Sequence, residues 1–130
     1  MFILSILLSF FLHFGAAGVV SQADSVETIF AALDRGSSSD LAEYFDSSIQ
    51  LNVNGQQGNY SKNQAEQVLK EFFKKNPPTS FSVVYKSENS TSLSSYVGDY
   101  QSNGGSYKVF LKVIDQKQQV RLYSLEFVSA

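Results

Sequence analysis

The most constraining feature of the sequence is a change of hydrophobic period at the proline pair Pro77-Pro78. Before this pair, YSKNQAEQVLKEFFKK places apolar residues at helical spacing, and the two prolines prevent a helix from continuing. After it, apolar and polar residues alternate in segments separated by turn-forming residues, a pattern typical of antiparallel strands. The expected strands are FSVVYK, SLSSYVGDYQ, SYKVFLKVID and VRLYSLEFV. In FSVVYK, alternation places Phe81, Val83 and Tyr85 on one face. The second half of the chain therefore predicts a meander.

Two helices are expected after the N-terminal segment. In ADSVETIFAALDRG the apolar residues recur at helical spacing, with Asp24 as the N-cap and Gly36 as the C-terminal stop. A second, short helix is expected in SSSDLAEYF, capped by Ser39 or Asp40 and continuing to about Phe45.

The period then becomes that of a strand. Ile49, Leu51 and Val53 alternate with polar residues in SSIQLNVNG, which predicts a half-buried strand. NGQQGN is rich in turn-forming residues, and a short return strand can follow it through Tyr60. The longest helix is expected to begin at Ser61, with a capping box three residues on.

Helices that precede a run of antiparallel strands indicate an α+β fold, with helices packed on one curved, mainly antiparallel sheet. A single domain is expected over residues 24–130. The order of elements resembles the cone-shaped, cystatin-like fold of nuclear transport factor 2-like proteins, which SnoaL-type enzymes and ketosteroid isomerases share. DLAEYFD and YSKNQAEQVLKEFFKKNPP also resemble a family of small secreted bacterial domains of unknown function. The resemblance implies the fold and little about activity, because this fold carries unrelated functions.

The first 23 residues have the layout of a secretory signal peptide. Residues 2–14 are almost wholly apolar and are followed by small residues, and this run is shorter than the roughly 20 residues a spanning helix needs. Cleavage after Ala17, Gly18 or Ala23 would export the mature chain to the periplasm or the extracellular space, with no transmembrane segment left in it. No basic residue precedes the apolar run, so an uncleaved anchor is the alternative.

The composition excludes several chemistries from the mature chain. The sequence has no cysteine, and its one histidine, His13, lies in the segment expected to be removed. Thiol nucleophiles, histidine-based triads and metals bound by His or Cys are therefore not expected, nor is any cofactor. The net charge of −2 argues against nucleic acid as a partner, because nucleic acid requires a concentrated basic face.

Tyrosines and carboxylates are the remaining candidates for a site. Ketosteroid isomerases place a carboxylate base and tyrosine in an apolar pocket. The residues that could copy this arrangement are Tyr96, Asp99, Tyr100 and Glu126. Alternation along SLSSYVGDYQ, however, places Asp99 on the face opposite to Tyr96 and Tyr100, unless a bulge at Gly98 intervenes. No catalytic residue is therefore assigned, and a hairpin with aromatic flanks is the favoured interpretation.

The last two expected strands supply further candidates for a pocket or an interface. In VRLYSLEFV, alternation places Glu126 with Leu122, opposite to Tyr123 and Phe127. Glu126 is either a carboxylate in the cone interior or an outward residue near the rim, and we favour the outward position. Dimerisation through the open sheet is common in this fold class. The candidates for a homodimer contact are Phe110, Ile114, Tyr123 and Phe127, and the alternative is that these residues line the domain's own pocket.

The expected function is that of an exported, non-enzymatic domain that binds a small apolar ligand or a protein partner. One alternative is a structural or accessory envelope domain that dimerises. Another is an isomerase- or dehydratase-like enzyme that uses a carboxylate and tyrosines. A deep pocket that holds Glu126 or Asp99 would favour the enzyme, whereas a filled cone with an aromatic outer sheet face would favour the accessory domain.

Overall fold

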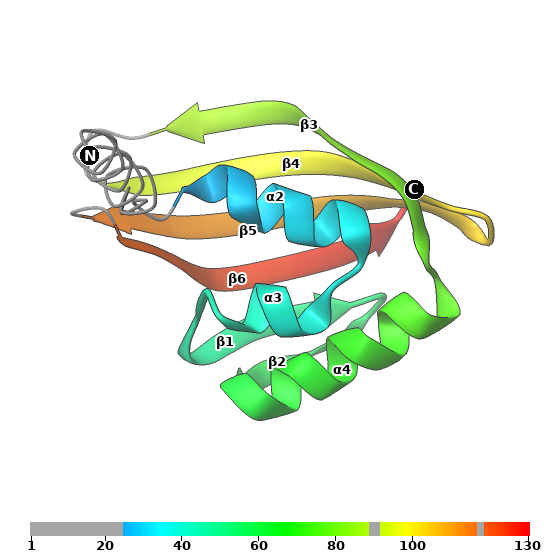
Figure 1. Cartoon of the computed structure of the whole chain (residues 1–130), viewed down its shortest axis with the longest axis horizontal. Coiled ribbons are helices and arrows are strands. Elements are labelled where there is room, and N and C mark those ends of the chain that lie inside the picture. The colour runs from blue at the N-terminus through cyan, green and yellow to red at the C-terminus, as the bar shows by residue number, and fades with distance from the viewer. Residues whose placement is uncertain (1–24, 89–91, 117–118) are drawn as a thin grey trace, which may run out of the picture.

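Three helices cover one face of a six-stranded sheet in the part of the chain that the computed structural model describes, residues 25–88, 92–116 and 119–130 (Figure 1). The helices are α2 (Val26–Arg35), α3 (Ser38–Ala42) and α4 (Lys62–Lys75). The strands are β1 (Phe45–Val53), β2 (Gln56–Ser61), β3 (Pro78–Glu88), β4 (Leu93–Ser102), β5 (Gly105–Gln116) and β6 (Gln119–Ser129). The expected α+β architecture is confirmed, and the short return strand is present as β2.

The strand order in the sheet is β2-β1-β6-β5-β4-β3. β3 to β6 form the expected antiparallel meander, and β1 and β2 form an antiparallel hairpin. β1 pairs in parallel with β6, so the first and last strands lie side by side in the middle of the sheet. α4 carries the chain from β2 at one edge to β3 at the other, and it lies on the same side of the sheet as α2 and α3 (Figure 1).

The first helix ends as predicted but begins differently. Gly36 ends α2 in the left-handed conformation, with φ at 67°, which favours glycine. Ser25 is the N-cap, and its carbonyl accepts a hydrogen bond of 2.6 Å from the Thr28 hydroxyl. The predicted cap, Asp24, lies outside the described residues.

The second helix is shorter than predicted. Ser37 caps α3, because its extended backbone lets its hydroxyl accept the backbone N–H of Asp40 at 3.2 Å. The prediction of Ser39 or Asp40 as the cap is therefore wrong. The helix ends at Ala42, and Phe45 begins the first strand.

The longest helix matches its prediction closely. Ser61 and Gln64 form the capping box, in which the Ser61 hydroxyl accepts the Gln64 N–H and the Gln64 side chain accepts the Ser61 N–H. The buried residues of α4 form one stripe, at Ala65, Leu69, Phe72 and Phe73. This stripe packs α4 against α3 and β1.

A β-bulge in β3 changes one face that simple alternation predicts. Val84 is an extra residue opposite the step from Gly98 to Val97 in β4. Tyr85 therefore points away from the helices and is 59% exposed. Its expected position on the same face as Phe81 is wrong, because the extra residue reverses the alternation beyond it.

A second bulge, which lies in β6, also reverses the alternation of side chains between the two faces. Tyr123 is an extra residue between Leu122 and Ser124 in the pairing with β5. Leu122 is consequently fully buried together with Phe127, on the face opposite to Glu126. The prediction that Leu122 shares the face of Glu126 is wrong for this reason.

No helix in the described ranges has the length and apolar character needed to cross a membrane. The predicted signal peptide, residues 1–23, lies outside those ranges.

Candidate functional site

The sheet has two faces with different surroundings. The helix-covered face carries the side chains that point toward α2, α3 and α4, among them Tyr100 and Phe127, both fully buried. The open face carries the alternate side chains of the same strands, among them Asp99, Phe110 and Glu126. The three helices of the described ranges, α2, α3 and α4, lie on the other side of the sheet (Figure 1).

Aromatic rings fill the interior beneath the C-terminal end of α4. The ring centroid of Phe72 lies 4.6 Å from that of Phe127 and 5.1 Å from that of Tyr107. The ring of Tyr100 lies 5.7 Å from Phe127 and 6.1 Å from Phe73. These are separations at which aromatic pairs attract each other. This part of the cone is therefore packed with side chains.

The hydroxyl groups of the predicted tyrosines are engaged in structural hydrogen bonds. Tyr100 donates to the backbone carbonyl of Asn76, the residue that ends α4, and Tyr107 donates to the side-chain oxygen of Asn76 at 3.2 Å. Tyr96 donates to Glu88 at 3.0 Å. Burial raises the pKa of Tyr100, and burial together with Glu88 raises the pKa of Tyr96. Both tyrosines are therefore protonated near neutral pH.

Asp99 lies on the open face, away from the two tyrosines, as strand alternation predicts. Its carboxylate forms an ion pair with the ammonium of Lys108 on β5. β4 stays in register with β5 through Gly98, so no bulge there turns Asp99 inward. The ring of Phe81 packs over Gly98, where an added Cβ would lie 2.4 Å from ring carbons. The structure does not bring Asp99 and the tyrosines together.

The other predicted residues also separate between the two faces. Phe127 is fully buried in the core, which agrees with the interior alternative and not with a contact on the outer face of the sheet. Phe110 lies on the open face and is 40% exposed, and Ile114 lies half-buried on the same face. Tyr123 is half-buried at the bulge of β6. Glu126 points to the open face, the position that we favoured.

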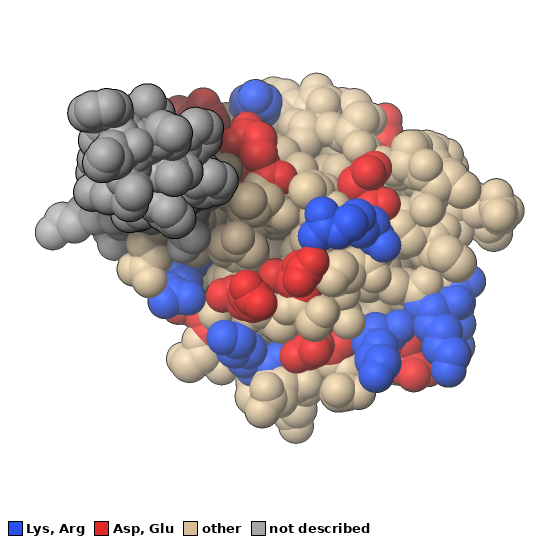
Figure 2. All heavy atoms as spheres, in the orientation of Figure 1, with Lys and Arg blue, Asp and Glu red and all other residues tan. Residues whose placement is uncertain are grey.

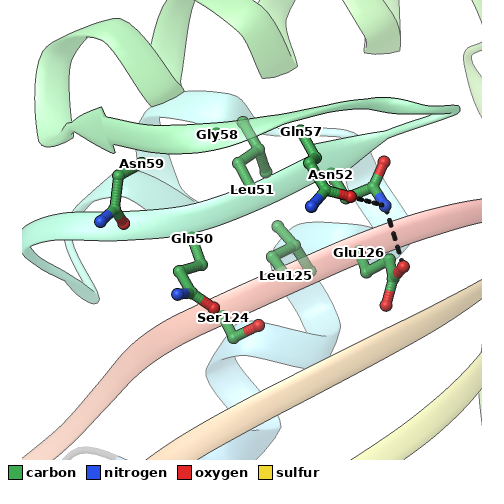
Figure 3. Close-up of a pocket in the computed structure, with 9 residues that line it drawn as sticks. All are labelled: Gln50, Leu51, Asn52, Gln57, Gly58, Asn59, Ser124, Leu125 and Glu126. Carbon is green, nitrogen blue, oxygen red and sulfur yellow. Dashed lines mark hydrogen bonds between the residues drawn. The ribbon is translucent and has the colours of Figure 1, made fainter.

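A hollow of about 290 Å³ lies on the open face where β2, β1 and β6 run side by side (Figure 3). Its lining residues are Gln50, Leu51, Asn52, Gln57, Gly58, Asn59, Ser124, Leu125 and Glu126. Strand pairing arranges the polar ones in two rows. Gln50 is the partner of Asn59 on one side and Ser124 on the other. Asn52 is the partner of Gln57 and Glu126 in the same way. We call this region the amide hollow.

Asn52 links the side chains of the row that contains the Glu126 carboxylate by hydrogen bonds. Its Nδ2 donates to Oε2 of Glu126 at 2.9 Å and more weakly to Oε1 of Gln57 at 3.5 Å, as the dashed lines of Figure 3 show. Its Oδ1 accepts the backbone N–H of Gly55 at 3.0 Å, in the turn between β1 and β2. Asn54 and Gly55 make this turn with φ at 53° and 96°, which an Asn-Gly pair adopts readily. The hairpin turn therefore fixes the amide that orients Glu126.

The other row, which Gln50 forms with its two partners, makes no side-chain hydrogen bonds to the described residues. Among the described residues, the side chains of Gln50, Asn59 and Ser124 have no hydrogen-bond partner. In Figure 3 the amide of Gln50 points toward Ser124. The carboxylate of Glu126 has Asn52 as its one described partner. The hollow thus holds several donors and acceptors available to a ligand, and no Lys or Arg lines it.

Sequence reasoning singled out Glu126 alone among the residues of this hollow. The pattern assigns Gln50 and Asn52 only to the polar side of a strand, and Gln57 and Asn59 to a turn. A signal was present in QLNVNGQQGN, because alternating amides on both arms of a hairpin fall on one face. The pairing that adds Glu126, 74 residues from Asn52, leaves no local signal.

A second hollow, of about 220 Å³, lies on the other side, between α4 and the ends of β1, β2 and β5. It is lined by Val53, Asn54, Gln56, Val68, Glu71, Phe72, Lys75, Asn76 and Tyr107. Across the described ranges, no group of three or more His, Cys, Asp or Glu side chains could hold a metal ion.

Charged side chains of both signs are interspersed on the helical side of the molecule (Figure 2). One ion pair joins Arg35 at the end of α2 to Asp40 in α3, with 2.6 Å between nitrogen and oxygen. The hydrogen bond from Arg35 holds the pKa of Asp40 below its ordinary value. Both side chains are about half exposed, so this pair contributes little to stability.

Solved structures with the same architecture define the class of this protein. A nuclear transport factor 2-like protein of unknown function from Silicibacter pomeroyi DSS-3 is similar, with a TM-score of 0.60, 17% identity, and coverage of 81% of this chain and 89% of that chain. A domain of unknown function with a cystatin-like fold from Nostoc punctiforme PCC 73102 is also similar, with a TM-score of 0.61, 11% identity, and coverage of 80% and 72%. The chain has the nuclear transport factor 2-like fold, which confirms the predicted resemblance.

The family is narrower than this class. The chain belongs to DUF4783, a family of domains of unknown function, whose model matches residues 26–127. The crystal structure of a DUF4783 family protein from Bacteroides ovatus ATCC 8483 is similar, with a TM-score of 0.74, 23% identity, and coverage of 85% of this chain and 98% of that chain. No curated protein matches the sequence. These similarities establish the fold and the family and name no activity, so function has to be argued from the geometry of this chain.

Proposed function

We propose that this protein is an exported, non-enzymatic binding domain that contacts its ligand through the open face of its sheet. One observation carries the proposal. The amide hollow gathers Gln50, Asn59 and Ser124, which have no hydrogen-bond partner among the described residues, around the Glu126 carboxylate. Polar groups that converge in a concave region can fix the orientation of a ligand bound there.

The packing of the helix-covered face also supports the choice of the open face as the binding surface. An apolar ligand would need an apolar cavity, and rings of Phe72, Tyr100 and Phe127 occupy the interior at the end of α4. The second hollow is not apolar either, because Glu71 and Lys75 are among its lining residues.

An isomerase-like site would need a carboxylate and tyrosines together. The predicted carboxylates Glu126 and Asp99 point to the open face, whereas the predicted tyrosines are buried on the other face. Tyr96 does contact the carboxylate of Glu88, but Glu88 lines neither hollow.

Native mass spectrometry of the protein purified from cells that express it naturally tests the proposal. We expect wild type to retain a small molecule, and Ser124→Trp to lose it by filling the hollow. Ser95→Trp is the matched control, because Ser95 lies on the same face two strands away. A wild-type protein without a bound molecule would contradict the proposal. So would a molecule that Ser124→Trp retains as well as wild type does.

Export is the second part of the proposal. It is supported by the apolar run over residues 2–14 and the small residues that follow it. N-terminal sequencing of the protein from an envelope or culture fraction should yield a chain that begins after Ala17, Gly18 or Ala23. An intact Met1 in a cytoplasmic fraction would be the opposite result.

Self-association is a second candidate function, favoured by a separate observation. On the half of the open face formed by β3, β4 and β5, the side chains of Tyr85, Val97 and Phe110 form a cross-strand row. Tyr85 is 59% and Phe110 40% exposed. The Asp99–Lys108 pair beside this row carries both signs, which suits contact with a second copy of the same surface.

Sedimentation velocity tests self-association. We expect a dimer for wild type and a monomer for Tyr85→Lys, because a charge in the row would face another copy. Ala31→Lys on the exposed side of α2 adds the same charge away from the sheet and should leave the dimer intact. A monomeric wild type at all concentrations would remove this candidate and leave the amide hollow unaffected.

A further inference from the structure

We infer that the amide hollow is a binding site for a neutral saccharide, such as the end of a glycan chain. This inference rests on the proposed binding function of the open face and names its class of ligand. It is carried by the chemistry of the groups that strand pairing brings together in the two rows of the hollow.

The primary amides match the hydrogen-bonding character of a sugar. Each amide of Gln50, Gln57 and Asn59 offers two N–H donors and a carbonyl acceptor in one plane. Each sugar hydroxyl donates one hydrogen bond and accepts others, so two neighbouring hydroxyls can bond to one amide as donor and acceptor. Amides on adjacent strands therefore present a surface suited to several hydroxyl groups of one ring.

Glu126 adds a strong acceptor in a fixed orientation. The Nδ2 of Asn52 holds one carboxylate oxygen at 2.9 Å, and the other oxygen has no partner among the described residues. A hydroxyl that donates to a carboxylate makes a charge-assisted hydrogen bond, which is stronger than a neutral one. The carboxylate thus anchors one hydroxyl while the neighbouring amides bond to others.

The charges of the lining select against other small ligands. No Lys or Arg lines the hollow, and Lys112 borders it as the cross-strand partner of Ser124, in the row without the carboxylate. A phosphate, nucleotide or carboxylate ligand would be repelled by Glu126, which lies within the lining itself. An apolar ligand would leave the amides and the carboxylate buried without partners, which is costly. A neutral ligand with many hydroxyl groups avoids both penalties.

Size and neighbourhood agree with a saccharide. The hollow, at about 290 Å³, is at the small end of the roughly 300–1,000 Å³ range of small-molecule sites. Phe110 is the cross-strand partner of Glu126 on β5 and is 40% exposed at the border of the hollow. An exposed aromatic ring beside a polar cluster can cover the apolar C–H face of a sugar ring.

A peptide fits this location less well. An extended peptide bonds to a sheet through the unpaired backbone groups of an edge strand. The amide hollow includes the edge strand β2, but its lining side chains point from the open face of β2, β1 and β6. A peptide paired with the edge of β2 would lie beside the hollow, in the plane of the sheet, and not over it.

Titration followed by NMR of the 15N-labelled protein tests the inference, because the side-chain NH2 signals of Gln50, Gln57 and Asn59 report directly on the hollow. The probes are cellobiose, maltose, lactose and N,N′-diacetylchitobiose at millimolar concentrations, with acetyl-trialanine amide as the peptide probe. At least one disaccharide should shift these NH2 signals. Glu126→Gln should weaken its binding about tenfold, because the charged acceptor is lost. Gln67→Ala on the exposed side of α4 is the control and should bind as wild type.

The inference fails if none of the four disaccharides shifts these signals, if Glu126→Gln binds as tightly as wild type, or if the peptide alone shifts them. Its failure is distinguishable from that of the binding function. A retained molecule that is lost in Ser124→Trp and is not a saccharide would keep the binding site and overturn only its ligand class.

Discussion

Neighbouring residues of one strand lie in different environments on the two faces of the sheet. On β4, Tyr100 is fully buried beneath α4, whereas Asp99, the residue before it, lies on the open face in an ion pair. On β6, Phe127 is in the core and Glu126 borders the amide hollow. The hydroxyl of Tyr100 donates a hydrogen bond to a backbone carbonyl, whereas one carboxylate oxygen of Glu126 has no partner among the described residues. The helix-covered face therefore holds the core, and the open groups of the other face support our proposal that the open face binds a ligand.

The largest effect on the free energy of unfolding is expected from substitution of two phenylalanines, one on each face of the sheet. Phe127→Ala removes a fully buried ring and should lower the free energy of unfolding by about 3–5 kcal/mol. Phe110→Ala, on the open face, should lower it by about 1 kcal/mol or less. Urea denaturation of both variants measures the difference. Similar losses at the two positions would break the comparison.

The next effect concerns the close approach of Phe81 to β4. Gly98→Ala would place a methyl group 2.4 Å from carbons of the Phe81 ring, so the ring must move. We expect a loss of about 1–3 kcal/mol in the free energy of unfolding. A double-mutant cycle with Phe81→Ala should show that most of this cost disappears when the ring is absent. Gly104→Ala, in the turn between β4 and β5, is the control and should cost less, since an added Cβ meets nothing closer than 3.8 Å.

A smaller effect is expected at alkaline pH, from the tyrosines of the helix-covered face. The pKa values of Tyr96 and Tyr100 are raised in the folded protein, mainly by burial. Below about pH 10, the ordinary tyrosine value, both the folded and unfolded states keep these protons. Above it the unfolded chain loses them first, so the free energy of unfolding should fall as pH rises toward the folded-state pKa.

Urea denaturation across this alkaline range measures the decline. Tyr100→Phe should make it shallower, whereas Tyr85→Phe, at an exposed position, should leave it unchanged. An equal decline in wild type and Tyr100→Phe would mean that burial of Tyr100 does not contribute.

The smallest effect is expected at Asp99. Its ion pair with Lys108 is partly exposed, with side-chain exposures of 35% and 44%, so Asp99→Asn should cost about 1 kcal/mol or less. Circular dichroism should show an intact fold. A loss above about 3 kcal/mol would identify a carboxylate on which the core depends, and the assignment of stability to the helix-covered face would need revision.

Local pattern predicts the elements and most of the faces of this protein. Alternation separates Asp99 from Tyr96 and Tyr100, and the capping box at Ser61 marks the start of α4, because both depend on residues a few positions apart. The order of these elements was sufficient to predict the α+β class and the nuclear transport factor 2-like fold.

The bulges and the long-range pairing depend on the assembled sheet. Whether a strand accommodates an extra residue is determined by its neighbours, so Val84 and Tyr123 carry no clear local signal and the faces of Tyr85 and Leu122 were mispredicted. The parallel pairing of β1 with β6 places Asn52 beside Glu126 across 74 residues. Local periodicity specifies which way a side chain points only where no bulge interrupts the strand. The amide hollow depends on which strands become neighbours, and that is a property of the packed sheet as a whole.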